Sequence, residues 1–118
     1  MQPKDALGKA GEDLAARYLV AHGMQILDRN WRCRLGEIDL VARDGQTVVI
    51  CEVKTRSTAG YDGPLAAITP LRLQRLERLA HLWLDAHQMR QCWVRLDAIG
   101  IVQGRSSGPH IQHVQGLC

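Results

Sequence analysis

The sequence predicts an α/β fold in which a central mixed β-sheet is flanked by α-helices. Apolar residues recur at helical spacing over residues 7–22 and again over residues 69–88. Between these segments, residues 36–43 and 47–54 alternate as β-strands do, and the Asp-Gly pair at 44–45 that separates them is a strong hairpin-turn signal. At 118 residues the chain can bury a core, and we expect a single domain over residues 1–118.

The first helix and the first strand precede this hairpin. The helix at residues 7–22 is expected to stop at Gly23. The residues at helical spacing along it are Leu7, Ala10, Leu14, Tyr18 and Ala21. Residues 24–31 are predicted to form a strand, and the loop after it carries Arg32 and Arg34.

A second helix and two strands follow the hairpin. Residues 55–68 are predicted to be a loop, after which Thr69 and Pro70 suit the N-cap and the first residue of a helix that runs to about residue 88. Its expected core residues are Leu76, Leu79, Ala80, Trp83 and Leu84. The remaining predicted elements are a strand at 93–102, a turn at 104–109 and a short strand at 110–114.

The composition restricts the possible functions. A net charge of +3, from 15 Lys and Arg against 12 Asp and Glu, permits a nucleic-acid partner without requiring one. Three Trp, two Tyr and no Phe are too few for an aromatic platform that stacks single-stranded bases. The first residues lack the apolar stretch expected of a signal peptide, and the sequence has no apolar run near the roughly 20 residues of a membrane span and no Cys-x-x-Cys. We expect a cytoplasmic protein without a membrane contact, whose cysteines are reduced, small buried apolar residues.

The hairpin brings acidic and basic side chains to one face. Because side chains alternate along a strand, Asp39 shares a face with Glu37, and Glu52 shares a face with Lys54. If residues 44–45 form the loop, Glu37 falls directly opposite Glu52. Asp39 is then the diagonal neighbour of Glu52, about 7–8 Å away.

Two carboxylates this close repel each other unless a cation lies between them. Oxygen ligands suit Mg²⁺, or Mn²⁺ in its place, which could bind a substrate phosphate and activate a water. Asp39 and Glu52 are therefore candidate metal ligands and catalytic residues, and Lys54 could stabilise the developing negative charge. Glu12 is a third candidate ligand, because it lies only about 20° around the helix axis from Leu19 and so borders the buried stripe.

Four segments together closely resemble the YraN-type family of small, uncharacterised bacterial proteins. They are Gly-Glu at 11–12, NWRCR at 30–34, GEIDL at 36–40 and EVK at 52–54. The resemblance covers roughly residues 7–101. That family is similar to the restriction-endonuclease-like PD-(D/E)xK nuclease superfamily, nearest to archaeal Holliday junction resolvases.

The resemblance implies a restriction-endonuclease-like core and an Mg²⁺-dependent endonuclease that acts on DNA, including branched or structured DNA. It implies that Glu12, Asp39 and Glu52 are the metal-site acids and that Lys54 is the catalytic lysine. A homodimer is expected only by analogy with resolvases, which cut two strands symmetrically.

The chain also departs from that family. Arg72 and Leu73 stand where the family usually has Lys-Gln, so the charge is kept and a polar contact is lost. His113 and Cys118 stand where it usually has Trp and a terminal Phe, which affects C-terminal packing or a partner surface more than the chemistry.

The arginines allow two interpretations. Arg72, Arg75 and Arg78 recur every three residues, as on an ordinary solvated helix face or on a track that binds phosphates. On the second interpretation the predicted nucleic-acid-binding residues are Arg32, Arg34, Arg56, Arg72 and Arg75.

The acids and histidines also have non-catalytic interpretations. The hairpin acids could form a solvated face on which Lys54 pairs with Glu52, and Glu37 could be a structural acid. His110 and His113 fall on opposite sides of a strand, which argues against a metal pair. The protein could then be an inactive nucleic-acid-binding or adaptor protein with the nuclease fold, or a protein-interaction module.

Overall fold

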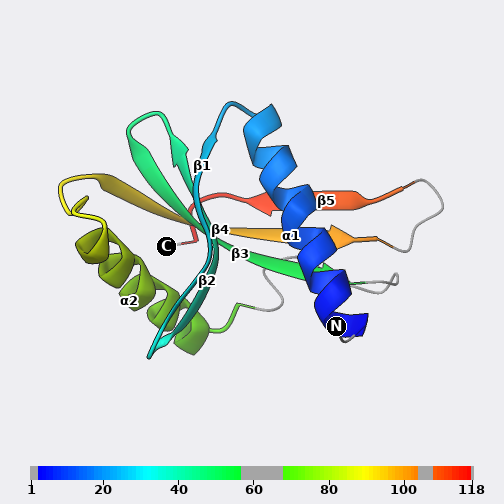
Figure 1. Ribbon diagram of the computed structural model, residues 1–118, viewed down its shortest axis with the longest axis horizontal. Helices are drawn as coiled ribbons and strands as arrows, with labels where there is room; N and C mark the ends of the chain where they lie inside the picture. Colours follow the sequence, from blue (N-terminus) through cyan, green and yellow to red (C-terminus); the bar gives the residue numbers. More distant parts are fainter. Residues whose placement is uncertain (1–2, 57–67, 104–107, 118) are drawn as a thin grey trace.

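A computed structural model of the chain describes residues 3–56, 68–103 and 108–117. Its elements are α1 (Pro3–Ala21), β1 (Gln25–Cys33), β2 (Gly36–Asp44), β3 (Thr47–Arg56), α2 (Pro70–Ala86), β4 (Trp93–Val102) and β5 (His110–Val114). The strands form one sheet in the order β1-β2-β3-β4-β5 (Figure 1). β3 and β4 are parallel and the other neighbours are antiparallel, which confirms the α/β class with a mixed sheet flanked by helices.

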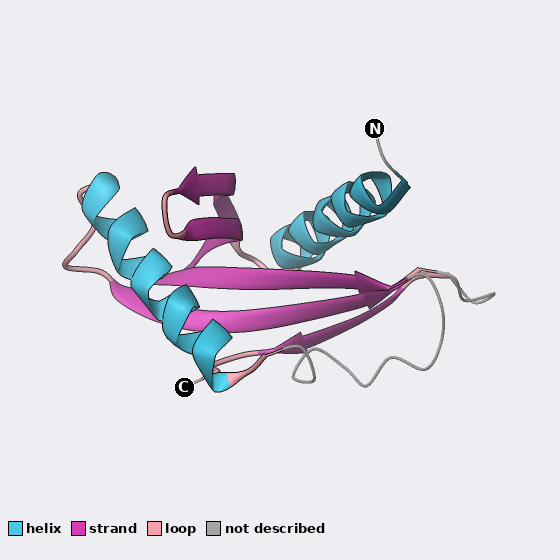
Figure 2. Cartoon of the chain, turned by 90° about the horizontal axis from the view of Figure 1, so that it is seen from below, coloured by secondary structure: helices cyan, strands magenta, loops and turns pink. Residues whose placement is uncertain are grey.

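The two helices pack against opposite faces of this sheet (Figure 2). Along β3, Val49 and Cys51 belong to the apolar core under α1, whereas Val48 and Ile50 belong to the core under α2. All five predicted core residues of α2 are buried. A strand covered on both faces is apolar at successive positions, as residues 48–51 are.

The helix boundaries follow from capping residues. α1 begins at Pro3, a favourable first helical residue, four residues before the predicted start. Gly23, with φ of +88°, follows its end in the left-handed conformation that terminates helices. At the start of α2, the Thr69 side chain accepts a hydrogen bond of 3.1 Å from the Arg72 backbone N–H, and Pro70 is the first residue, as predicted.

α1 approaches β3 closely at Gly11. A Cβ atom added at Gly11 would lie 2.9 Å from Cβ of Thr55, well inside van der Waals contact. Glycine therefore permits the close approach of helix and strand, and the next residue along the helix is Glu12.

The predicted hairpin loop was wrong by one residue. Asp44 pairs with Thr47, so the loop is Gly45-Gln46. Gly45 has φ of +62° at the first loop position, as a type II′ turn requires. The register consequently shifts by two residues, which leaves every side chain on its predicted face.

The strand ends differ from prediction mainly at β1 and at β3. β1 runs two residues past its predicted end, to Cys33, so Arg32 lies in this strand and not in the loop after it. The other main difference is at β3. This strand continues to Arg56, inside the predicted loop, because it pairs with parallel β4 as far as Arg56↔Val102. β4 and β5 have the predicted limits. The rest of the predicted loop at 57–67, and residues 104–107 of the predicted turn, lie outside the described residues.

Candidate metal and phosphate site

A cavity of about 320 Å³ lies where the second half of β3 meets the first turns of α2. Its polar lining residues are Glu37, Asp39, Glu52, Lys54, Arg72 and Arg75. All three predicted catalytic residues and two of the predicted arginines therefore border one cavity. The cavity combines carboxylates, which attract cations, with the positive charges that attract phosphate.

Asp39 lies where β2 and β3 stop pairing. The last pair of this ladder is Leu40↔Cys51. Continued by one residue, the register would place Asp39 opposite Glu52, in place of the predicted diagonal arrangement. Instead of a backbone bond at that step, Oδ2 of Asp39 accepts a hydrogen bond of 2.8 Å from the Val53 N–H. The carboxylate is thus fixed by the backbone of the neighbouring strand.

The carboxyl group of Asp39 has a perturbed pKa. Burial, aided by the charges of Glu12 and Glu37, raises its pKa to about 6 against the opposing effects of the Val53 N–H and the Arg72 charge. Near neutral pH the folded protein therefore holds an ionised carboxylate that lacks sufficient positive charge around it. A bound cation would relieve the repulsion between this carboxylate and those of Glu12 and Glu37.

Glu12, Glu37 and Asp39 converge from two elements. One carboxylate oxygen from each lies within 4.8 Å of the other two, which is the spacing of ligands around a metal ion. Glu12 reaches the cluster from α1 although that helix packs on the face opposite α2. Carboxylate oxygens are the donors that Mg²⁺ and Mn²⁺ prefer, so this donor set fits a hard divalent cation.

Asn30 organises two of these acids and was missed as a site residue in the sequence. Its side-chain N–H₂ group donates to Oε1 of Glu12 at 2.7 Å and to Oε1 of Glu37 at 3.0 Å. The backbone of Asn30 has φ of +52°, which asparagine tolerates better than most residues. The one indication in the sequence was the presence of an asparagine, a residue that tolerates positive φ, within the NWRCR segment.

Glu52 lies apart from this cluster within the described residues. Its carboxylate Oε1 forms an ion pair with Nη2 of Arg72, at the start of α2, and not with Lys54 as a solvated hairpin face would have it. The Glu52 side chain is 12% exposed, so this contact neutralises a largely buried charge.

The other three predicted arginines do not line the cavity. Nε of Arg32 contacts Oε2 of the lining residue Glu37 at 3.1 Å. Arg34 is exposed in the turn between β1 and β2, and Arg56 is exposed at the end of β3. Only Arg72 and Arg75 among the five line the cavity itself.

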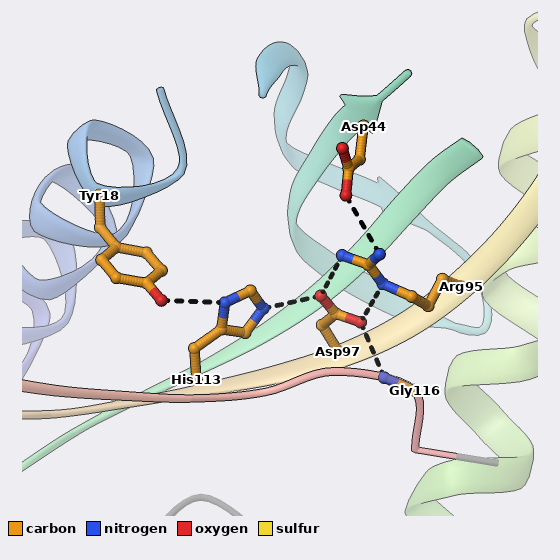
Figure 3. A network of polar contacts seen from close by, with 6 residues as sticks. All are labelled: Tyr18, Asp44, Arg95, Asp97, His113 and Gly116. Atoms are coloured by element: carbon orange, nitrogen blue, oxygen red, sulfur yellow. Dashed lines mark hydrogen bonds and ion pairs between the residues drawn. The ribbon is translucent and has the colours of Figure 1, made fainter. Parts of the chain in front are cut away.

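A second polar network lies on the face of the sheet that α1 covers (Figure 3). Asp97 is fully buried and accepts hydrogen bonds from Arg95 at 2.9 and 3.0 Å, from Nε2 of His113 at 2.7 Å and from the Gly116 N–H at 3.1 Å. Nδ1 of His113 in turn pairs with the Tyr18 hydroxyl at 3.2 Å.

The network joins α1, β4 and β5, and it accounts for His113 at a position where tryptophan was expected from the resemblance. Burial alone would raise the pKa of Asp97, but the hydrogen bonds from His113 and Arg95 outweigh burial and lower the pKa below its usual value. We assign the network a structural role.

Three of the four cysteines lie in the described part of the chain and are free thiols. Cys51 is fully buried, and burial raises the pKa of its thiol, as expected of a small apolar core residue. Cys33 and Cys92 are half-buried, and Cys118 lies outside the described residues. Among those residues, neither helix is long and apolar enough to cross a membrane.

Comparison with known proteins identifies relatives along the whole chain. The family model of the uncharacterised protein family UPF0102 matches residues 11–101. A UPF0102 protein of Streptomyces griseus subsp. griseus is 49% identical over 118 residues, covering 99% of each chain. One of Nocardioides sp. is 49% identical over 114 residues, covering 97% of this chain and 92% of the relative.

Among solved structures, the chain is similar to SfsA of Pyrococcus furiosus in complex with Ca²⁺. The TM-score is 0.45 and the sequence identity is 15%. The match covers 96% of this chain and 64% of the SfsA chain.

Proposed function

The chain belongs to the uncharacterised protein family UPF0102, and we propose that it is an Mg²⁺- or Mn²⁺-dependent endonuclease that hydrolyses phosphodiester bonds in DNA, including branched or structured DNA. One observation carries the proposal. The half-buried carboxylate of Asp39 lies beside Glu12 and Glu37 at a cavity that also contains Lys54 and two arginines. Metal-assisted phosphodiester cleavage requires acidic side chains that hold a cation and positively charged side chains that hold the phosphate.

Each residue has a distinct part in this proposal. Asp39, Glu12 and Glu52 would hold the metal, and Asp39 is already oriented by the Val53 N–H. The bound ion would supply positive charge to the scissile phosphate and lower the pKa of a coordinated water. Lys54 would stabilise the negative charge that develops on the phosphate oxygens.

The first turns of α2 would bind the phosphates of the DNA. Arg72 and Arg75 line the cavity there, and the positive end of the α2 helix dipole adds partial positive charge. Arg32, Arg34 and Arg56 would extend this contact along the DNA backbone. In this proposal the chain acts as one nuclease-like domain over residues 1–118 in the cytoplasm, and a homodimer would cut two strands.

A cleavage assay tests the proposal. Purified protein is incubated with linear duplex or four-way junction DNA and Mg²⁺ or Mn²⁺. We expect cleavage that a chelator abolishes and that Asp39→Ala, Glu52→Ala and Lys54→Ala each reduce by about 100-fold or more. Glu77→Gln is the matched control, because Glu77 is an exposed acid of α2 outside the cavity. Cleavage that persists unchanged in both Asp39→Ala and Glu52→Ala would refute the proposal.

A second candidate function is an inactive nucleic-acid-binding or adaptor protein that retains the nuclease fold. The observation that favours it is the Glu52–Arg72 ion pair, which engages one of the proposed metal ligands. This second function predicts salt-sensitive DNA binding without turnover. Binding would be lost when Arg72 and Arg75 are neutralised, and Asp39→Asn would not affect it.

A further inference from the structure

The Glu52–Arg72 ion pair joins two side chains in unequal environments. The Glu52 side chain is 12% exposed, whereas the Arg72 side chain is 46% exposed. A largely buried carboxylate needs a positive partner, because an uncompensated buried charge is costly. A half-exposed guanidinium can instead exchange its partner for water or for another anion at little cost.

The backbone of Arg72 is fixed, but its long side chain can change position. The Arg72 N–H donates to the Thr69 side chain at the N-cap of α2, and Pro70 fixes the first turn. A change of partner therefore needs only rotations about the side-chain bonds of Arg72. Those occur far faster than DNA binding or cleavage.

Arg72 supplies the cationic contact that Glu52 makes, whereas Glu12 and Asp39 have neutral donors and Glu37 has one neutral donor beside the exposed Arg32. Glu12 and Glu37 receive the Asn30 amide, and Asp39 receives a backbone N–H. The guanidinium thus occupies the part of the cavity in which Glu52 would meet a metal ion. Arg75 lines the same cavity, and no ion pair of Arg75 occurs among the described residues.

We propose that Arg72 is an internal substitute for the metal. It occupies Glu52 while no divalent cation is bound, leaves Glu52 when the cation binds, and then carries its charge to a phosphate of the DNA. The inference rests on the proposed function, because it takes Asp39 and Glu52 as metal ligands.

This exchange couples the binding of metal and DNA. The cation must displace Arg72, so the metal alone binds more weakly than the carboxylates by themselves would allow. DNA that engages Arg72 removes this competition, and by thermodynamic reciprocity the metal strengthens DNA binding by the same factor. The site would therefore be loaded with metal mainly when DNA is present.

Titration calorimetry with Mn²⁺ alone tests the exchange without relying on cleavage. Arg72→Gln removes the charge but keeps a long polar side chain, and we expect it to bind Mn²⁺ about 10-fold more tightly than the unaltered protein. Arg75→Gln is the matched control, because it removes a charge from the same cavity without touching Glu52. Its Mn²⁺ affinity should change less than about 3-fold.

The same variants should behave differently toward DNA. With Ca²⁺ present, Arg72→Gln and Arg75→Gln should each weaken duplex binding, because each removes one phosphate contact. Only Arg72→Gln combines tighter metal binding with weaker DNA binding. Arg72→Lys, which keeps the charge but not the fork of donors, should give an intermediate Mn²⁺ affinity.

Two results would overturn the inference alone: Mn²⁺ affinity unchanged or weaker in Arg72→Gln, or equal tightening in Arg75→Gln. Failure of the proposed function looks different. If the unaltered protein does not bind Mn²⁺, or if Asp39→Asn binds it equally well, the metal site itself is wrong and the inference falls with it. Circular dichroism of each variant confirms that it is folded.

Discussion

Asp39 is ionised in the unfolded chain above its ordinary pKa of 3.8, whereas burial raises its pKa to about 6 in the folded protein. The folded state therefore binds a proton more tightly than the unfolded state does. Stability is reduced as pH rises from 3.8 to about 6, and the full penalty applies above that pH. A shift of this size corresponds to at most about 3 kcal/mol.

We predict that Asp39→Asn stabilises the metal-free protein by about 1–3 kcal/mol at pH 7.5, because the amide is never ionised. At pH 4.5 the gain should fall to about 1 kcal/mol or less, since Asp39 is then protonated in the folded protein. Urea unfolding in a chelator at the two pH values measures the difference.

Asp85→Asn serves as the control for this prediction. Asp85 is exposed and pairs with Arg90 on the surface, so its replacement should change stability by less than about 0.5 kcal/mol at either pH. A gain from Asp39→Asn that does not depend on pH, or a loss at pH 7.5, would contradict the assignment of the raised pKa.

Residue-level prediction from the sequence succeeded where the backbone pattern decides the outcome. Asp39, Glu52 and Lys54 point to the predicted face, because alternation along a strand is local. Prediction failed for the side chains that these residues contact. No local pattern indicated that Arg72 pairs with Glu52, or that Asn30 bridges two acids, because these contacts join distant segments.

At the scale of elements, the network around Asp97 attaches β5 and the segment after it to the rest of the sheet. β5 is one of the two edge strands of the described sheet and pairs with β4. The side chain of His113 extends from β5 to Asp97 on β4 and to Tyr18 on α1 (Figure 3). Because Asp97 has a lowered pKa, its contribution to stability is complete above its ordinary pKa of 3.8 and is lost as pH falls through the lower folded value.

We predict that Asp97→Ala destabilises the protein by about 3–5 kcal/mol at neutral pH, because it leaves Arg95 and His113 without their buried partner. Amide hydrogen exchange should accelerate first in β5. Asp44→Ala is the matched control: Asp44 contacts the same Arg95 at 3.2 Å but is 44% exposed, so its loss should cost less than about 1 kcal/mol. Equal costs for the two variants would contradict the role of the network.

The positions of the elements were predictable because their signals are local. The Thr69-Pro70 cap and the spacing of buried residues located α2, and alternation located β2 and β3. The loop of the hairpin was wrong because Asp-Gly and Gly-Gln both provide a glycine, and pairing along the whole ladder decides between them.

At the scale of the whole molecule, the cavity exists only in the folded chain. The acids of the site come from α1, β2 and β3, and its arginines come from α2, so no single segment carries a complete site. A ligand that binds the folded state alone stabilises it in proportion to the logarithm of its concentration. Metal binding should therefore be visible as an increase in stability even where cleavage is slow.

We predict that Mn²⁺ at 100 times its dissociation constant increases the free energy of unfolding by about 2.7 kcal/mol. Asp39→Ala should show no increase at the same concentration, and Glu77→Gln should show the full increase. Thermal unfolding with and without Mn²⁺ measures this, and a chelator should reverse it. An equal increase in Asp39→Ala would mean that the ion binds elsewhere on the protein.

Sequence alone was sufficient for the α/β class, the order of helices and strands, and the face on which Asp39, Glu52 and Lys54 lie. Each of these depends on residues a few positions apart, whose spacing and capping preferences act locally. The folded structure was needed to learn that Glu37, and not Glu52, lies with Glu12 and Asp39. It was also needed to learn that Asn30 donates to two of these acids and that Arg72 pairs with Glu52. Those contacts depend on how α1 and α2 pack on the sheet, and packing is set by the whole core, which no local pattern encodes.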